Sequence, residues 1–76
     1  MADRAELYGT ASCPYTRELR EQLLWENRTF VEYDVEEDPA ALERMRGLTG
    51  NGRMVPVLVE DGRVTRIGWQ GRGCLV

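Results

Sequence analysis

The dipeptide Asp61-Gly62 separates two short runs of strand-forming residues, 55–60 and 64–67. An Asp-Gly pair in this setting is a strong short-range signal of a hairpin turn. This part of the chain therefore predicts two antiparallel strands. Because proline donates no backbone hydrogen bond, we expect Pro56 at the start of its strand or on an edge of the sheet.

Two helices and two more strands are predicted before the hairpin. Residues 5–8 and 29–35 are rich in strand-forming side chains, whereas 14–27 and 39–48 carry helical signals. The expected order is β-α-β-α-β-β, an α/β fold in which a right-handed crossover makes the first two strands parallel. A chain of 76 residues has room for one thin core, so we assign residues 1–76 to a single domain.

Both helices have recognisable starts. Asp38 before Pro39 is a helix-start signal. Pro14 suits a first helical position, because its missing N–H would be unpaired there anyway. Cys13 is therefore expected at or beside the N-cap of the first helix. The apolar stripe of that helix is expected to comprise Tyr15, Leu19, Leu23 and Leu24.

Composition restricts the chemistry. All ten basic residues are arginine, thirteen residues are acidic, and the net charge of −3 argues against a nucleic-acid-binding surface. Histidine is absent, which excludes a serine–histidine triad and histidine-containing metal sites. Two cysteines cannot enclose a structural zinc ion within one chain, so no metal is expected. No apolar run approaches the ~20 residues that span a bilayer, and without a secretory signal we expect a cytoplasmic protein.

Cys13 is the strongest candidate for a reactive group. A helix N-terminus offers unpaired N–H donors and a partial positive charge, both of which favour the thiolate over the thiol. We therefore expect Cys13 to be solvent-accessible, with a pKa below the ~8.5 of a free thiol. The alternative is a small buried hydrophobic residue.

Cys74 has two interpretations. It is either a resolving thiol, which attacks a mixed disulfide on Cys13, or a residue whose thiol is incidental. The length of the intervening chain is no objection to pairing, because loop-closure entropy grows slowly. A disulfide also requires Cα atoms within about 7 Å of each other, and for this reason the incidental interpretation is favoured.

Two motifs resemble those of glutaredoxins. They are residues 7–16, Leu-Tyr-Gly-Thr-Ala-Ser-Cys-Pro-Tyr-Thr, and Val55-Pro56 before the hairpin. The resemblance extends over essentially the whole chain. It implies a thioredoxin-like fold and thiol–disulfide exchange in which Cys13 is the attacking thiol. It also implies a cis Val55-Pro56 bond beside the site, with the Val55 backbone ready to pair with an extended substrate strand. Pro14 and Tyr15 join this substrate-binding set, although the spacing of Tyr15 favours a core position.

The chain departs from dithiol glutaredoxins at Thr16, where those proteins carry a second cysteine. The resemblance therefore implies a one-cysteine mechanism. Thr16 lies one helical turn from Cys13. Either its hydroxyl donates a hydrogen bond to the Cys13 thiolate, or Thr16 is simply a residue that the first turn of the helix tolerates. Thr10 replaces a basic residue that the family commonly uses near a glutathione carboxylate, and residues 68–72 lack the usual Gly-Gly-x-Asp.

Arg53 and the Trp69-x-Gly71 pattern instead resemble NrdH-type redoxins, which serve ribonucleotide reductase and are typically reduced by thioredoxin reductase. Glutathione and thioredoxin reductase are therefore both candidate electron donors. Disulfide-containing proteins are the expected substrates, and Arg53, Gly68 and Trp69 are assigned to substrate binding.

The chain continues for only nine residues after Ile67, whereas glutaredoxins usually add a further helix over the sheet. The ending Trp-Gln-Gly-Arg-Gly-Cys resembles the UXX-star (seleno)protein family, some of whose members carry selenocysteine at the position of Cys13. Without that helix, the spare apolar residues for this face are Trp69, Leu75 and Val76. We expect Trp69 to be substantially buried there, either because the tail, residues 68–76, folds back or because two chains meet as a homodimer.

The expected function is a one-cysteine, glutaredoxin-like thiol–disulfide oxidoreductase in cell redox homeostasis. The Cys13 thiolate attacks a protein disulfide or a glutathione mixed disulfide and becomes bonded to the substrate. A second thiol, supplied by glutathione as co-substrate, then releases the product. No cofactor is required. One alternative is a carrier that holds a [2Fe–2S] cluster in a glutathione-bridged dimer, although Pro14 departs from the Gly-Phe-Ser pattern of the usual carriers. The other alternative is a non-catalytic interaction module with an unreactive Cys13.

Overall fold

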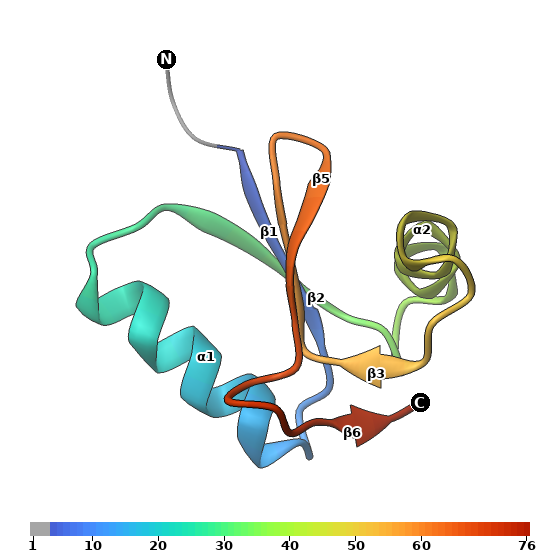
Figure 1. The fold of residues 1–76 in the computed structure, drawn as a ribbon, viewed down its shortest axis with the longest axis horizontal. Coiled ribbons are helices and arrows are strands. Elements are labelled where there is room, and N and C mark those ends of the chain that lie inside the picture. The colour runs from blue at the N-terminus through green and yellow to red at the C-terminus, as the bar shows by residue number, and fades with distance from the viewer. Residues whose placement is uncertain (1–3) are drawn as a thin grey trace.

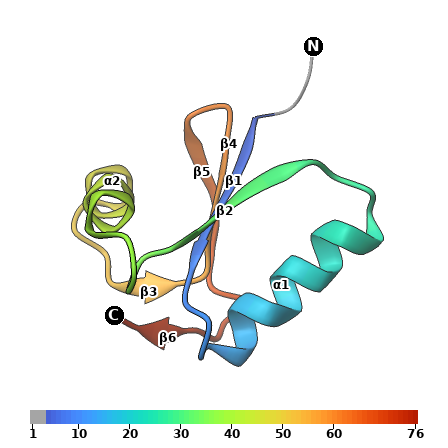
Figure 2. The same cartoon turned by 180° about the vertical axis from the view of Figure 1, so that it is seen from behind.

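The computed structural model describes residues 4–76. A four-stranded sheet lies between two helices, α1 (Pro14–Trp25) on one face and α2 (Pro39–Thr49) on the other (Figures 1 and 2). A second sheet of two short strands, β3 (Met54–Val55) and β6 (Cys74–Leu75), lies at one end of the molecule. The strands of the larger sheet are β1 (Ala5–Gly9), β2 (Phe30–Asp34), β4 (Val57–Glu60) and β5 (Arg63–Ile67).

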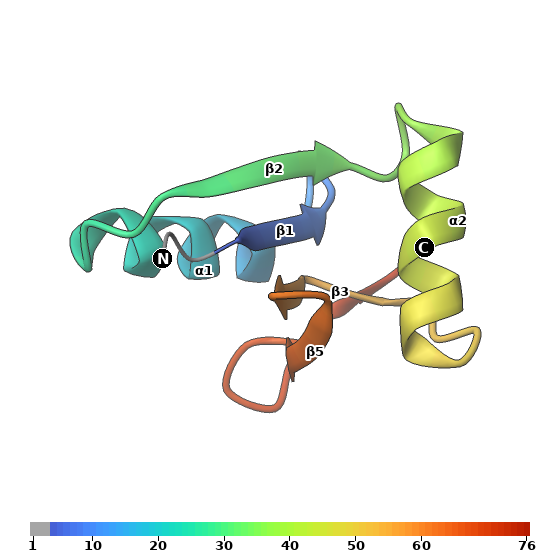
Figure 3. The ribbon, with the colours of Figure 1, turned by 90° about the horizontal axis from the view of Figure 1, so that it is seen from above.

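The spatial order of the larger sheet is β2-β1-β4-β5. β1 runs parallel to β2, as the crossover predicted, and β4 runs antiparallel to β5, as the hairpin predicted. β1 and β4 are antiparallel to each other. Seen from above, α1 runs alongside β1 and β2, whereas α2 stands across them (Figure 3). The predicted α/β architecture of thioredoxin type is confirmed. No helix within residues 4–76 is long and apolar enough to cross a membrane.

The predicted strand 55–60 is divided at Pro56. β3 ends at Val55 and β4 begins at Val57, and the two belong to different sheets. Proline has no N–H to donate to a strand ladder, so the pairing is interrupted at this residue. The division leaves β3 to pair with β6, a strand that the sequence did not predict.

Local signals account for the element ends. The Asp38 carboxylate caps α2 by accepting hydrogen bonds from the backbone N–H groups of Ala40 and Ala41, at 3.1 and 3.2 Å. Gly50, with φ of 67°, ends that helix in the left-handed conformation. Asp61 and Gly62 have φ of 53° and 81°, as a two-residue hairpin turn requires.

The core has two halves because successive residues of a strand point to opposite faces of the sheet. The half under α1 contains Ala5, Leu7, Leu19, Leu23 and Leu58. The half under α2 contains Tyr8, Cys13, Val35, Ala41, Met45, Val55, Val57 and Val59. Cys13 therefore belongs to the core on the α2 side, although it lies at the start of α1.

The apolar stripe of α1 is rotated from the prediction. Its buried residues are Thr16, Leu19 and Leu23. Leu24 is 57% exposed, so the expectation that it widens the stripe is wrong. Tyr15 packs against the α2-side cluster instead. The face towards the sheet follows i, i+3 and i+7, and this places the threonine hydroxyl where an apolar side chain would ordinarily lie.

The described residues after β5 form a tight loop and then β6, without a helix. Trp69 and Arg72 exchange backbone hydrogen bonds of 2.6 and 2.9 Å around Gln70 and Gly71, which both have positive φ. This turn lays Trp69, partly buried, against the cluster under α1. The tail therefore folds back within one chain, as one of the two expectations for Trp69 required.

The rest of the tail does not cover that face. Leu75 is 78% exposed, and Val76 packs against the α2-side cluster. The expectation that these two residues help to cover the face under α1 is wrong. Beyond the turn at Trp69 the chain crosses to β3, and this pairing carries it away from α1.

Candidate active site

Cys13 and Cys74 form a disulfide that joins the start of α1 to β6. Their Cα atoms lie 6.0 Å apart, although 61 positions separate the two residues in the sequence. The prediction that the Cys74 thiol is incidental is therefore wrong. The geometric objection fails because β6 folds back beside β3 and brings Cys74 within reach of the helix start (Figures 1 and 2).

Cys13 is the N-cap residue of α1, as predicted. Its backbone is extended, with φ of −84° and ψ of 117°, and Pro14 follows in the first turn. The Cys13 N–H donates to the Thr10 carbonyl at 3.3 Å, and its own carbonyl accepts from the Arg17 N–H at 3.3 Å. The Cys13 side chain makes no capping hydrogen bond. Its sulfur is thus left for covalent chemistry at the positive end of the helix.

Cys13 is 2% exposed, so the expectation that it is solvent-accessible is wrong for the disulfide form. It packs in the cluster that contains Val55, with Tyr15 and Cys74 partly buried against that cluster. Tyr15 therefore packs against the same cluster as Cys13 and not against the cluster of Leu19 and Leu23. The predicted low pKa of the Cys13 thiol stays a prediction, because a disulfide sulfur carries no titratable proton.

The Val55-Pro56 bond is cis, as the resemblance implied. Val55 is fully buried and lies opposite Cys74 in the antiparallel pair of β3 and β6, with Met54 opposite Leu75. The Val55 backbone was expected to receive an extended substrate strand. In this structure the chain's own tail is paired with it.

Several further contacts hold the tail on this edge. The Val76 N–H donates to the Arg53 carbonyl at 2.8 Å, and the Arg53 Nε donates to the Val76 carbonyl at 2.7 Å. The Gly68 N–H donates to the Pro56 carbonyl at 2.7 Å. Arg53 and Gly68, both expected to contact substrate, are therefore engaged with the tail and the cis-proline.

Gly73 allows the close approach of the two strands. A Cβ atom at this position would lie 2.6 Å from both the Val55 carbonyl oxygen and the Met54 Cγ. Because the first of these is a backbone atom, it has no rotamer through which to move away. Sequence reasoning did not single out Gly73, and one glycine in the glycine-rich stretch 68–73 offered no signal that would have done so.

Thr16 lies one helical turn after Cys13, is fully buried, and packs against Gly9, where an added Cβ would overlap the threonine side chain. Its Oγ1 has no hydrogen-bond partner among the described residues. A buried hydroxyl without a partner is unfavourable by about 1–3 kcal/mol. The oxidised site thus contains an unused hydrogen-bond donor close to the helix start.

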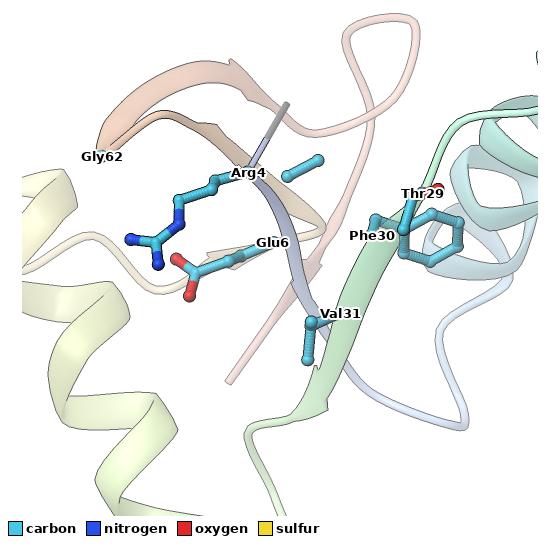
Figure 4. A pocket seen from close by; sticks show the side chains of 7 residues that line it. Arg4, Glu6, Thr29, Phe30, Val31 and Gly62 are labelled. Atoms are coloured by element: carbon cyan, nitrogen blue, oxygen red, sulfur yellow. The ribbon is translucent and has the colours of Figure 1, made fainter. Parts of the chain in front are cut away.

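An open cavity of about 490 Å³ lies at the opposite end of the sheet, by the starts of β1 and β2 and the turn between β4 and β5 (Figure 4). It contains neither cysteine. The residues that line it are Arg4, Ala5, Glu6, Thr29, Phe30, Val31 and Gly62. Within residues 4–76, no group of three or more potential metal ligands is arranged to hold an ion.

The fold and the cysteine pair define a thioredoxin-type protein with a disulfide at a helix start. The family model for glutaredoxin matches residues 5–65, most of the chain, so the protein belongs to the glutaredoxin family. The match includes Cys13, Thr16 and the cis-proline, and it ends before Cys74. A thiol–disulfide oxidoreductase-like function follows from this family and this site.

Two crystal structures of the thioredoxin-like protein BC3987, one of them of a point mutant, resemble this structure. Each has a TM-score of 0.77, is 32% identical in sequence and covers 87% of this chain. The matches span 82% of the mutant chain and 88% of the other. A search of curated proteins found no match.

Proposed function

We propose that the protein is a two-cysteine thiol–disulfide oxidoreductase, in which Cys13 attacks the substrate and Cys74 resolves the intermediate. The observation that carries this proposal is the Cys13–Cys74 disulfide at the N-terminus of α1. It replaces the one-cysteine mechanism that Thr16 suggested. The second thiol is supplied by the tail and not by the helix.

The proposed cycle transfers two electrons to the substrate. In the reduced protein the Cys13 thiolate attacks a substrate disulfide, forming a mixed disulfide and releasing one substrate sulfur as a thiolate. The Cys74 thiolate then attacks the Cys13 sulfur, which forms the observed disulfide and releases the second substrate sulfur. Cys13 is the first attacker because the start of α1 favours its thiolate, whereas Cys74 lies in a strand.

Reduction of the protein begins at Cys74 in this scheme. Cys13 is 2% exposed and Cys74 is only partly buried, so an external thiolate reaches the Cys74 sulfur more readily. That attack expels Cys13 as the leaving thiolate, which its position at the helix start favours. A second thiol then removes the donor from Cys74, and the protein gains two electrons and two protons.

Either glutathione or thioredoxin reductase is proposed as the electron donor. Thr10 and the Gly68–Arg72 segment lack the residues that the family commonly uses to hold glutathione, and the Arg53–Trp69 features resemble NrdH-type redoxins. Pairing the protein separately with glutathione plus its reductase, and with thioredoxin reductase, tests this. Turnover with only one of them identifies the donor. We also propose that the protein belongs to the UXX-star group, that it is cytoplasmic, and that its substrates are protein disulfides.

The iron–sulfur carrier is the weaker candidate. Its ligand would be the Cys13 thiolate, which in this structure is bonded to Cys74. Anaerobically purified protein without absorbance above about 400 nm counts against it. A non-catalytic module predicts an unreactive Cys13.

A chromogenic mixed disulfide tests the proposed function directly. Reduced protein is mixed with a cysteine peptide bonded to thionitrobenzoate, and release of the chromophore is followed by absorbance. Wild-type protein is expected to release one equivalent and to end as the Cys13–Cys74 disulfide, detected by mass after alkylation. No release, or release without closure of the disulfide, contradicts the two-cysteine proposal.

A further inference from the structure

The tail occupies the edge of β3 as a short bound peptide. It runs antiparallel to β3, places Cys74 opposite Val55, and joins its sulfur to Cys13. Strand addition of this kind binds through backbone hydrogen bonds, while neighbouring side chains decide which sequences fit. The residues of the oxidised chain at this edge therefore serve as a model for the sequence of a peptide that binds there.

Resting on the proposed function, we propose that residues 73–75 act as an internal substrate that shares the β3 edge with external ones. The external substrates that fit are extended polypeptides with glycine immediately before the reactive cysteine. The tail leaves β3 when the disulfide is reduced, and it returns to displace the bound substrate when Cys74 resolves the mixed disulfide.

The glycine requirement comes from Gly73. At this register, a Cβ on the residue before the cysteine meets the Val55 carbonyl oxygen at 2.6 Å. Any peptide that bonds to Cys13 in the register of the tail brings its own preceding residue to the same place. A larger residue there must shift the peptide away from β3. The following residue is not restricted in this way, because Leu75 is 78% exposed.

Release of the tail on reduction follows from how little else holds it. β3 and β6 are two residues long. Beyond their pairing, residues 74–76 are held by two hydrogen bonds between Arg53 and Val76 and by the packing of the partly buried Cys74 and Val76 against the α2-side cluster. Arg53 is exposed, so water competes for its contact. Once the sulfur–sulfur bond is broken, a substrate strand competes with the tail for the same backbone groups.

Resolution is then a strand exchange. With a substrate strand on β3, Cys74 cannot take its observed place opposite Val55. Its thiolate attacks the Cys13 sulfur as β6 re-forms, the new Cys13–Cys74 bond replaces the mixed disulfide, and the substrate leaves as a thiolate. Electrons and atoms balance as in the cycle above, and product release and resolution become one step.

Two peptides measure the glycine requirement. Arg-Gly-Cys-Leu-Val and Arg-Val-Cys-Leu-Val, each bonded through cysteine to thionitrobenzoate, are mixed with the reduced Cys74→Ser variant, in which the tail cannot resolve. Rates are divided by those of the same peptides with a small free thiol, which removes differences in intrinsic reactivity. We expect the glycine peptide to react about tenfold faster or more, the size of effect that a backbone clash produces.

A variant pair measures the same requirement in the tail. Gly73→Ala is compared with Gly47→Ala, whose added Cβ meets nothing within 4 Å. Equilibration with a glutathione redox buffer is expected to give an about tenfold lower closing constant for Gly73→Ala and an unchanged one for the control. Equal corrected rates for the two peptides, or an unchanged constant in Gly73→Ala, overturns the inference. Absence of chromophore release by the wild-type protein with either peptide overturns the proposed function instead.

Discussion

Val55, the residue before the cis-proline, faces Cys74 across the antiparallel pair of β3 and β6, and Cys74 is bonded in turn to Cys13. The helix start, the cis-proline edge and the tail thus meet in one place, although they come from the beginning, the middle and the end of the chain. The tail is both the partner of the redox bond and the occupant of the edge beside it. In the proposed cycle the chemistry and the access to the site are therefore coupled.

Replacing each cysteine separately distinguishes the attacking thiol from the resolving one. Cys13→Ser and Cys74→Ser both lose the cross-link, so any loss of stability is common to the two variants. We expect Cys13→Ser to release no chromophore from a peptide–thionitrobenzoate disulfide. Cys74→Ser is expected to release one equivalent and to stop as a mixed disulfide on Cys13, visible by mass. Reaction of Cys13→Ser at the wild-type rate would contradict the assignment.

Reduction is expected to destabilise the protein. The Cys13–Cys74 bond spans 61 positions, and closing a loop of that length in the unfolded chain corresponds to about 4 kcal/mol in the chain-entropy model. Denaturant unfolding of the oxidised and reduced proteins measures the difference. The reduced wild-type protein and Cys74→Ser should have closely similar unfolding free energies, because both lack the bond. Equal stability of the oxidised and reduced proteins would contradict this expectation.

The core of the fold could be predicted because local signals and periodicity agree along most of the chain. Asp61-Gly62, the Asp38 cap and the helix start at Pro14 each specify their element without help from distant residues. The place of Cys13 at a helix start was also predictable, since it is a local feature. The rotated stripe of α1 was not, because Thr16 and Tyr15 exchange the places that polarity alone would assign.

The tail could not be predicted because its structure depends on contacts that are far away in sequence. β6 has two residues, too few for a strand pattern, and it is held by pairing with β3 and by the bond to Cys13. The role of Gly73 likewise depends on the Val55 carbonyl, which only the folded chain brings near. Sequence separation alone left the pairing of Cys74 open, and geometry decided it.

Trp69 is expected to stabilise the fold. It packs against the cluster under α1, and the Arg66 guanidinium carbon lies 5.2 Å from the centre of its ring. Trp69→Ala should lower the unfolding free energy by about 1–3 kcal/mol, less than a fully buried tryptophan would cost. Trp25, which is 85% exposed, provides the control, and Trp25→Ala should change stability by less than about 0.5 kcal/mol. A larger loss in Trp25→Ala than in Trp69→Ala would reverse the assignment.

Acid should weaken the contact between Glu60 and its neighbours. The Thr65 hydroxyl, which donates to the Glu60 carboxylate at 2.6 Å, and then Arg28 lower the pKa of Glu60. A carboxylate with a lowered pKa adds stability above its unfolded value and loses it as the pH falls through the folded value. The effect is about 1 kcal/mol or less, because the Glu60 side chain is 30% exposed. Between about pH 5 and pH 3 the unfolding free energy should therefore fall with a shallower slope in Glu60→Gln than in the wild-type protein.

Thr16 is expected to change its contacts between the oxidised and the reduced protein. In the oxidised protein its hydroxyl is buried without a partner, and a valine of the same shape removes that polar group. Thr16→Val should therefore raise the unfolding free energy of the oxidised protein by about 1 kcal/mol. In the reduced protein we expect the hydroxyl to donate to the Cys13 thiolate, one helical turn away.

This second role is measured by the rate of Cys13 alkylation against pH. Thr16→Val should move the midpoint to higher pH by about one unit, the size that a hydrogen bond to a charged sulfur implies. Thr16→Ser keeps the hydroxyl and loses only the methyl group that packs on Gly9, so its midpoint should match the wild-type value even though the variant is less stable. If valine and serine give the same midpoint as threonine, the hydroxyl takes no part in ionisation and Thr16 serves packing alone. If valine moves the midpoint and serine gives the wild-type value, the Thr16 hydroxyl donates the hydrogen bond that stabilises the attacking thiolate.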